Sequence, residues 1–583
     1  MSDIFDRPYD RESFVSFLCG SFLTEDAGRR EELKRSGLTF GYIREVTELC
    51  SAPALDCAVL EIRHESESDP RVGLSRDTFR LMSEFNMERV LAAFVSPGSD
   101  NWRLSLITID LTLGDGKIER SYSNPRRLSY LLGPSARVRT PRQYLLKKGR
   151  VKDFEDVRSR FSVEVVNKEF YGEIARAFSC LAGGRRMVKS HEEEFAGVLK
   201  LPSKAPGDPK YKEFSVRLIG RLIFCWFLKK KISNNGRPLL PEGLLSSDAA
   251  RSTGDYYHEV LEPLFFKTLN TPIDERDAEF RKGVFAEIPF LNGGLFEPHP
   301  DDYYGKPSYR NTLKVPDEWF ADFFAILETY NFTIDENTTI DVDLSIDPEM
   351  LGRIFENLLA EINPETEETA RKATGSYYTP RNIVDYMVTE SIKQYLVTRT
   401  GIDASLVTDL LSFEMEGSSL SEDDNRKVVA ALEELRIIDP ACGSGAFPMG
   451  VLQKMVLVLQ KVDPDSKRWL ASLLSNIPDT TAREMMRRKL ENEHDMWDYT
   501  RKLGIIRKSI YGVDIQPIAV EIAKLRCFLS LIVDENVIDE KDNRNIEALP
   551  NLEFKFVCAN SLVDVPEEGQ QDGLLVDEYF EKM

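Results

Sequence analysis

The chain has 583 residues, of which 42% are hydrophobic and 30% charged, and this length suffices for roughly three or four domains of about 150 residues each. Such a composition excludes a disordered tail and a disulfide-stabilised miniprotein. The 76 Lys and Arg residues and 97 Asp and Glu residues give a net charge of −21, which argues against non-specific coating of DNA by the whole surface. Any contact with nucleic acid must therefore come from a local basic surface or from a partner.

The eight cysteines are scattered and form no CxxC pair, and only five His accompany them. We therefore expect no zinc site and no other bound metal. The N-terminal residues MSDIFDRPYDRESF are too charged for a signal peptide, and the best apolar run, Leu222 to Leu228, is too short to cross a bilayer. These features indicate a cytoplasmic protein with reduced cysteines and no membrane contact.

The predicted elements suggest three successive domains. In residues 1–165, three short β-rich runs (55–63, 89–96 and 102–111) predict a small α/β domain. Residues 166–365 have mostly helical apolar spacing, which predicts a helical connector. Residues 366–583 begin with the end of a polar candidate linker (363–375), after which strand-like and helix-like segments alternate, as in a parallel α/β sheet.

A glycine-rich loop follows residues 435–438, which we expect to form a buried strand. The loop reads Asp-Pro-Ala-Cys-Gly-Ser-Gly from Asp439 to Gly445, and a helical pattern follows it. Strand, glycine loop and helix together form a cradle for a nucleotide-type ligand, because glycine lets the backbone approach closely and the helix N-terminus offers free N–H groups. A tight turn without a ligand is the alternative for this loop taken alone.

Two further predicted strands end in polar side chains. Asp514 follows the strand at 509–513, where it can accept hydrogen bonds from ribose hydroxyls or merely cap the next helix. The third strand begins at Phe554 and ends at Asn560, whose amide can pair with an adenine edge or merely belong to a turn. Asp439 and Asp514 lie 75 residues apart, whereas a dinucleotide-binding fold places its acidic residue about 20 residues after the glycine loop. The spacing therefore disfavours NAD binding.

The loop from Asp439 to Gly445 resembles the first motif of DNA amino-methyltransferases, and Tyr-Gly-Val-Asp-Ile at 511–515 resembles their second. Upstream, Gly-Ser-Tyr-Tyr-Thr-Pro at 375–380 is similar to the motif that folds over the methionine end of S-adenosylmethionine (SAM). Its place ahead of the glycine loop resembles the gamma arrangement of adenine-N6 enzymes. The resemblance implies a Rossmann-like, SAM-dependent methyltransferase domain in residues 366–583, incomplete in this chain.

The same resemblance implies which residues hold SAM: Thr379, Asp439, Ala441 and Gly443 at the methionine end, Asp514 at the ribose, and Ile515 and Asn560 at the adenine. The family often has Asp at the last position. Asn560 keeps an acceptor oxygen there but loses the charge.

The helical middle also resembles a family, in residues 217–231, 288–297 and 347–359. These segments are similar to the connector of large single-chain type IIG restriction-modification enzymes and of the methyltransferase of BREX phage defence. Many type IIG relatives carry a metal-dependent nuclease at the N-terminus, and the closest match here is Asp56 with Glu61-Ile62-Arg63. Because Arg63 stands where Lys is usual and is a poor base, we expect a degenerate nuclease-like or DNA-contacting domain.

One part of the family pattern is missing. Methylation of an adenine amino group requires a side chain that holds the flipped base, and in the family an Asn-Pro-Pro-aromatic motif does this; the sequence contains no Asn-Pro-Pro. We also expect this chain to lack the C-terminal target-recognition domain of such enzymes. We therefore expect the SAM-binding part of a DNA adenine-N6 methyltransferase, inactive alone and completed by a second polypeptide that carries both. A truncated product and a non-catalytic SAM-binding or scaffold subunit of a phage-defence complex remain open.

Residues 120–152 form a basic segment with ten Lys or Arg, no Asp or Glu, and three interleaved Tyr. In a chain of net charge −21, this local excess predicts contact with the phosphates of double-stranded DNA through Arg137, Arg139, Lys147 and Lys148. Pairing with the protein's own acidic surface is the alternative.

Overall fold

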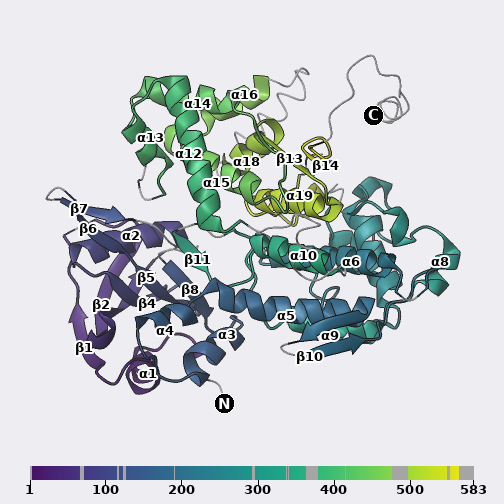
Figure 1. The fold of residues 1–583 in the computed structure, drawn as a ribbon, viewed down its shortest axis with the longest axis horizontal. Helices are drawn as coiled ribbons and strands as arrows, with labels where there is room; N and C mark the ends of the chain where they lie inside the picture. The colour runs from purple at the N-terminus through teal and green to yellow at the C-terminus, as the bar shows by residue number, and fades with distance from the viewer. Residues whose placement is uncertain are drawn as a thin grey trace.

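The computed structural model describes most of the chain, and Figure 1 shows how its helices and strands are arranged. The described residues are 3–37, 39–65, 71–114, 117–121, 127–188, 191–205, 207–291, 296–336, 338, 340–362, 379–413, 415, 417–475, 497–547, 550 and 552–562. Four residues of the upstream motif, Gly375 to Tyr378, lie outside these ranges.

A seven-stranded mixed sheet forms the N-terminal part, in the order β1-β2-β3-β4-β5-β8-β11. The pairs β3·β4 and β8·β11 are parallel and the other neighbours antiparallel. The strands are β1 (Gly28–Leu33), β2 (Ile43–Ala52), β3 (Cys57–His64), β4 (Arg89–Val95), β5 (Trp102–Thr108), β8 (Arg127–Leu132) and β11 (Asp341–Asp343), and a separate hairpin joins β6 (Asp110–Gly114) to β7 (Lys117–Ser121). Because β11 comes from the segment predicted to be the connector, the chain returns to extend the first sheet.

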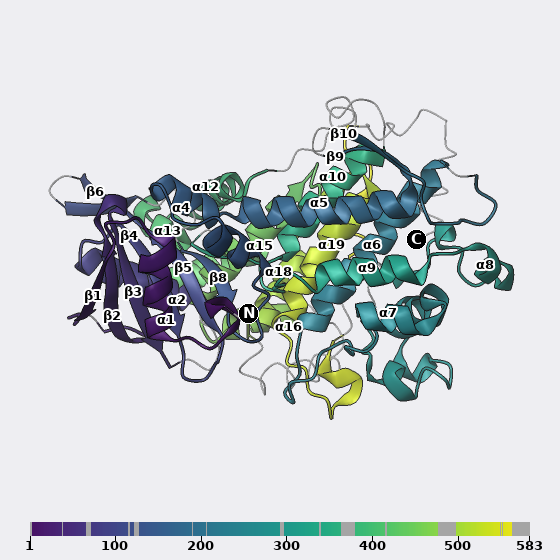
Figure 2. The same ribbon diagram turned by 90° about the horizontal axis from the view of Figure 1, so that it is seen from below.

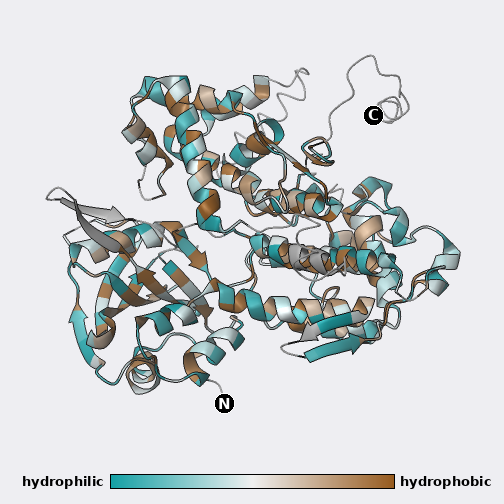
Figure 3. Ribbon diagram, viewed as in Figure 1, coloured by the Kyte–Doolittle hydropathy of each residue, from teal (hydrophilic) through white to brown (hydrophobic). Residues whose placement is uncertain are grey.

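Both faces of this sheet are buried, which explains the apolar runs of its central strands. In β4, Val90 and Phe94 pack on the side of α2 (Arg71–Glu84), whereas Leu91 and Ala93 face the core that includes α1 (Arg11–Phe17). Two short helices, α3 (Arg139–Pro141) and α4 (Phe154–Arg160), follow the sheet. Figure 3 shows hydrophobic strands in the centre and a hydrophilic β1 at the edge. A strand covered on both faces lacks the alternation of a half-exposed strand.

The middle of the chain is largely helical, as the sequence predicts. Its helices are α5 (Val163–Ala182), α6 (Pro209–Lys230), α7 (Ser247–Thr253), α8 (Pro307–Thr312), α9 (Asp317–Leu327) and α10 (Pro348–Ile362), and a β-hairpin, β9 (Gly184–Val188) with β10 (His191–Phe195), follows α5. The long helix α6 begins where the Asp208 side chain accepts a hydrogen bond from the Lys210 backbone, and it ends with two lysines. Both ends suit the helix dipole. Figure 2 shows α5 extending from the sheet along this helical layer.

The C-terminal part contains a parallel sheet in the order β12-β13-β14, with helices between successive strands. The strands are β12 (Ile437–Asp439), β13 (Ile510–Asp514) and β14 (Phe556–Cys558). The helices are α12 (Arg381–Thr400), α13 (Ala404–Leu411), α14 (Glu422–Glu434), α15 (Ala446–Val462), α16 (Lys467–Ser475), α18 (Trp497–Lys508) and α19 (Pro517–Ile532). This alternation confirms the predicted α/β class and is consistent with a Rossmann-like fold.

One prediction about this sheet is wrong. Residues 435–438 were expected to form a buried strand, but Ile438 is 63% exposed. The reason is its position: among the described residues β12 pairs only with β13, so β12 lies at an edge of the sheet. An apolar strand sequence is typical of a strand in the interior of a sheet, whereas in β12 the Ile438 side chain reaches the surface. The division of the chain at residues 165 and 365 stays a prediction.

Candidate functional site

The candidate site lies where the three parallel strands of the C-terminal sheet end. In the strand register Asp439 pairs with Gly512, and Asp514 pairs with Cys558. Because parallel strands present their carboxyl ends at one edge, the loops that follow them converge there. The structure thus brings together Asp439, Asp514 and the segment around Asn560, as the sequence predicts for a nucleotide-type cradle.

The glycine loop turns sharply between β12 and α15. Gly443 and Gly445 have φ angles of +52° and +84°, which residues other than glycine rarely adopt. A Cβ at Gly445 would also lie 3.1 Å from the Cβ of Ala523 on α19. At Gly443, by contrast, a Cβ would meet no atom of the described residues within 4 Å, so this part of the structure leaves the space beside Gly443 open. The loop therefore combines a tightly packed glycine with one that faces free space.

Asp514 ties the glycine loop to the second strand. One of its carboxylate oxygens accepts a hydrogen bond from the Gly443 backbone N–H at 2.9 Å, and the other accepts from the Gln516 backbone N–H at 2.8 Å. The second bond agrees with the alternative that Asp514 caps the next helix, since Gln516 directly precedes the first turn of α19. Each carboxylate oxygen can accept more than one hydrogen bond, so Asp514 retains capacity for a ligand.

Asp439 is the most unusual polar group at this edge. One carboxylate oxygen accepts from the Ala441 backbone N–H at 3.1 Å, whereas the other is buried without a hydrogen-bond partner among the described residues. Burial raises the pKa of Asp439, and the nearby Asp514 raises it further, although the Ala441 N–H acts in the opposite direction. A buried carboxylate oxygen without a donor is costly, so it marks a place for a ligand that donates hydrogen bonds or carries positive charge.

The end of the third strand contacts the glycine loop. The Asn560 side-chain oxygen accepts from the Leu562 backbone N–H at 3.0 Å, and the neighbouring Ser561 hydroxyl donates to the Pro440 carbonyl at 2.9 Å. Asn560 therefore sits in a turn beside the glycine loop, and its amide stays exposed. Ile515 is 56% exposed just beyond Asp514, and its side chain offers an apolar surface at the same edge.

Thr379 and Ala441 complete the set of predicted cofactor residues. Thr379 is half-buried and precedes Pro380, which caps α12, and Ala441 is exposed on the loop. Helix α12 packs closely on α15: a Cβ at Gly450 would lie only 2.7 Å from Val384. This packing connects the helix after Thr379 to the helix that begins at the glycine loop.

Sequence reasoning missed the residues that support the glycine loop from behind. The Arg526 guanidinium on α19 donates to the Ser444 carbonyl at 3.0 Å and to both carboxylate oxygens of Glu336 at 2.8 and 3.2 Å. Helix α10 also lies against the loop, because a Cβ at Gly352 would overlap with the Ser444 side chain. One signal was available: Arg526 lies next to the apolar stretch Cys527 to Leu529, and a buried arginine requires acceptors.

The residues of the predicted nuclease remnant have separate surroundings in the structure. Asp56 is exposed in the turn before β3, whereas Glu61 lies five residues further along that strand, about 16 Å away for extended chain. Glu61 accepts hydrogen bonds from Arg11 at 2.7 Å, from Arg63 at 2.7 Å and from the Tyr9 hydroxyl at 2.8 Å. Burial alone would raise the pKa of Glu61, but these donors hold it below its ordinary value. Glu61 is thus satisfied by the protein itself.

The basic segment contacts acidic side chains of the protein at two of its four predicted positions. Arg139 pairs with Glu173 at 2.6 Å, and Lys148 pairs with Asp156 at 3.1 Å. Arg137 and Lys147 are exposed, and no carboxylate pairs with their side chains among the described residues. Contact with DNA therefore stays a prediction for all four, and the structure separates them into two classes.

The described residues contain no group of three or more His, Cys, Asp and Glu side chains placed to hold a metal ion. None of the described helices combines the length and hydropathy that a membrane span requires.

Comparison with known proteins finds a relative of substantial similarity. No family model matches the chain. Over 429 residues, or 69% of its length, this chain is 31% identical to a protein of Methanocaldococcus jannaschii, and the match spans 32% of that protein. The relative is inferred to be a type II restriction enzyme and methyltransferase. Among solved structures, the type IIL restriction-modification enzyme MmeI in complex with DNA matches 69% of this chain and 40% of its own, with 14% identity and a TM-score of 0.36. The chain thus spans about a third of a larger relative with this inferred function.

Proposed function

We propose that the chain binds SAM at the carboxyl ends of β12, β13 and β14. One observation carries the proposal: among the described residues, a buried oxygen of Asp439 without a hydrogen-bond partner, open space beside Gly443 and the carboxylate of Asp514 occur together at one sheet edge. SAM fits this set, since it has an ammonium group for a buried carboxylate and ribose hydroxyls for a second one. When bound, SAM supplies the methyl group of a transfer reaction.

The proposed roles follow the order of the strands. Asp439, Ala441, Gly443 and Thr379 surround the methionine end, and Asp514 accepts hydrogen bonds from the ribose hydroxyls. Ile515 packs on the adenine ring with its exposed apolar side chain. Asn560 accepts a hydrogen bond from the adenine amino group; its oxygen already accepts one from Leu562, and a carbonyl oxygen has room for two.

We further propose that this SAM site serves a DNA adenine-N6 methyltransferase of restriction-modification or phage defence, with double-stranded DNA as substrate in the cytoplasm. Similarity to the inferred restriction enzyme and methyltransferase supports the DNA methyltransferase role. Residues 1–165, 166–365 and 366–583 then form a degenerate nuclease-like domain, a connector and the first part of the methyltransferase domain. Adenine specificity rests on the gamma-like order of the motifs, with Thr379 ahead of the glycine loop.

A second polypeptide is proposed to supply the acceptor motif and target recognition. The supporting observation is that the sequence contains no Asn-Pro-Pro, the motif that would hold a flipped adenine. The same observation supports one alternative, a non-catalytic SAM-binding or scaffold subunit of a phage-defence complex.

A transfer assay separates these two functions. The purified chain is incubated with methyl-labelled SAM and adenine-containing duplex DNA, alone and together with a polypeptide that bears Asn-Pro-Pro-aromatic. We expect no label on DNA from the chain alone and transfer when the second polypeptide is added. SAM binding without transfer in both cases would favour the scaffold function. Transfer by the chain alone would show that the acceptor group lies elsewhere in it.

A further inference from the structure

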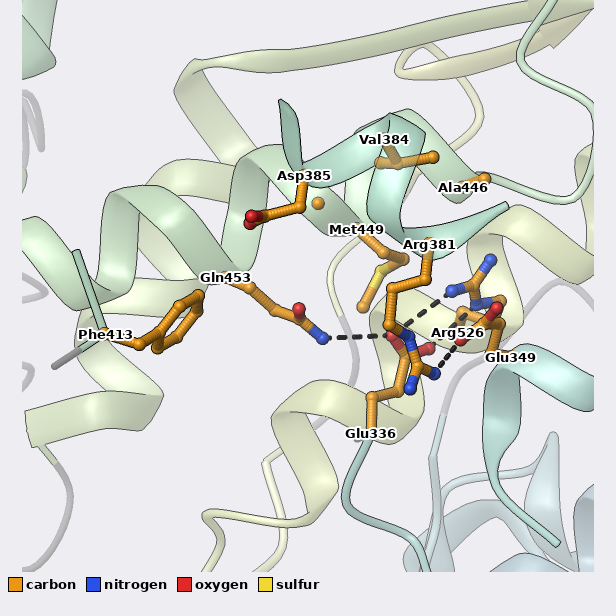
Figure 4. Close-up of a pocket in the computed structure, with 11 residues that line it drawn as sticks. Glu336, Glu349, Arg381, Val384, Asp385, Phe413, Ala446, Met449, Gln453 and Arg526 are labelled. Atoms are coloured by element: carbon orange, nitrogen blue, oxygen red, sulfur yellow. Dashed lines mark hydrogen bonds and ion pairs between the residues drawn. The ribbon is translucent and has the colours of Figure 1, made fainter. Parts of the chain in front are cut away.

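The glycine loop has a buried support that Arg526 and Glu336 form. One nitrogen of the Arg526 guanidinium donates a hydrogen bond to the Ser444 carbonyl at 3.0 Å. The two other nitrogens donate to the Glu336 carboxylate at 2.8 and 3.2 Å. Gln453 donates to the same carboxylate at 3.3 Å. Figure 4 shows the carboxylate of Glu336 between the side chains of Gln453 and Arg526. Three elements thus meet behind the loop: α15, α19 and the segment that precedes β11.

The contact between Arg526 and Glu336 is buried, so its hydrogen bonds must be well aligned. The side chains of Arg526 and Glu336 are only 3% and 9% exposed. A charge removed from water must have well-aligned partners, and a planar guanidinium can serve a carboxylate and a carbonyl at once, whereas a lysine ammonium cannot match that fork. The Ser444 carbonyl therefore has a fixed donor, and its orientation depends on the pair.

Three further contacts hold the loop. The Gly443 N–H binds Asp514 on one side, and Gly445 is fixed against Ala523 on α19. Gly352 of α10 contacts the Ser444 side chain, so a helix of the predicted connector lies against the same residue. Ser444 stands between the two glycines, which makes its peptide groups the part of the loop with the widest conformational choice.

We infer that Arg526 and Glu336 are positioning residues, which fix the Ser444 carbonyl and thereby hold the glycine loop in its ligand-binding conformation. This inference rests on the proposed function, because the ligand is taken to be SAM. It assigns part of the cofactor site to Glu336, a residue outside the methyltransferase part of the chain. The pair does not contact the ligand; it acts through the backbone of the loop.

The test combines SAM affinity with hydrogen exchange in the full-length chain. The variants are Arg526→Gln and Glu336→Gln, and Arg221→Gln is the matched control. Arg221 is equally buried on α6 and likewise joins a carboxylate, Asp302 at 2.9 Å, to a backbone carbonyl, Glu297 at 3.1 Å. Calorimetry gives the affinity for SAM, and exchange is followed at the loop amides of Cys442, Gly443 and Gly445, all hydrogen-bonded in the structure.

For Arg526→Gln we expect affinity about tenfold weaker, with faster exchange at the loop amides and unchanged exchange in β4. Arg221→Gln should retain wild-type affinity and loop exchange even if it lowers the melting temperature. Glu336→Gln should also weaken SAM affinity and speed exchange at the loop amides. If Arg526→Gln does not fold, Glu336→Gln alone tests the inference.

Two results would overturn the inference: wild-type affinity and loop exchange in the Arg526 and Glu336 variants, or an equal loss of affinity in Arg221→Gln. Failure of the proposed function gives a different signature, in which the wild-type chain itself does not bind SAM. The exchange measurement without SAM then still decides whether the pair holds the loop.

Discussion

At the scale of single residues, two aspartates with different surroundings define the proposed cofactor site. Asp514 is satisfied by two backbone N–H groups, so it organises the loop even without a ligand. Asp439 keeps one buried oxygen without a partner among the described residues, so it is the group that gains most from a ligand. One residue therefore shapes the site, and the other provides the unsatisfied charge.

Replacing Asp514 tests the first role. Asp514→Ala removes the acceptor for the Gly443 N–H together with the proposed ribose contacts, and we expect SAM binding weaker by about 1 to 3 kcal/mol, as for lost hydrogen bonds to a charged group. Asp514→Asn keeps one acceptor oxygen and should show a smaller loss. Titration calorimetry on the three proteins measures the difference, and equal affinities would remove Asp514 from the site.

Replacing Asp439 tests the second role through pH. Burial raises the pKa of Asp439 above its ordinary 3.8, so the folded chain loses stability as the pH rises through that higher pKa and the carboxyl ionises. The always neutral Asp439→Asn avoids this loss. We expect the variant to unfold at higher denaturant concentration than the wild type near pH 8, with a smaller difference near pH 4, and to bind SAM more weakly. A stability difference independent of pH would contradict the raised pKa.

At the scale of elements, local sequence patterns predicted the site, whereas the long-range contacts that support it could not be predicted from them. The strand, loop and helix around Gly443 are encoded in a few consecutive residues, so the sequence predicted their order and the convergence of Asp439 with Asp514. The pairing of Arg526 with Glu336 joins residues 190 positions apart, and no local pattern encodes it. The exposure of Ile438 was missed for a similar reason, because burial of a strand depends on its neighbours in the sheet.

The close approach of α10 to the glycine loop gives a prediction at this scale. A Cβ at Gly352 would overlap with the Ser444 side chain, so Gly352→Ala should displace the loop and weaken SAM binding, by about tenfold if the loop moves as in the Arg526 variant. The double variant Gly352→Ala with Ser444→Gly removes the overlapping atoms and should recover part of the affinity. Calorimetry measures both variants. Without such recovery, the effect of Gly352→Ala would have to come from elsewhere in α10.

At the scale of the whole molecule, one acidic segment connects the three parts of the chain. Glu336 binds Arg526 beside the glycine loop, and Asp347 binds Arg381 at 3.1 Å at the start of α12. Between them, β11 extends the N-terminal sheet, where Asp341 binds Arg71 at 2.7 Å. These ion pairs hold the segment against the N-terminal sheet and against helices α12 and α19 of the C-terminal part.

The basic segment gives a prediction about the whole surface. Arg137 and Lys147 have no carboxylate partner among the described residues, whereas Arg139 and Lys148 are paired with Glu173 and Asp156. If the segment binds phosphates, Arg137→Gln with Lys147→Gln should weaken binding to duplex DNA of any sequence.

Each lost phosphate contact should also lower the slope of log affinity against log salt by about 0.9. The control, Arg139→Gln with Lys148→Gln, should change affinity less, because those side chains must first leave their carboxylates. Fluorescence anisotropy with labelled duplex DNA over a salt series measures both. Unchanged affinity and slope in both double variants would assign the segment to the protein's own surface.

The central claim is that the carboxyl ends of β12, β13 and β14 form a SAM site, and titration of SAM into the purified chain tests it most directly. We predict saturable binding with one SAM per chain, weakened in Asp514→Ala and in Asp439→Asn. Absence of binding heat, both for the chain alone and for the chain mixed with a polypeptide that bears Asn-Pro-Pro-aromatic, would contradict the claim.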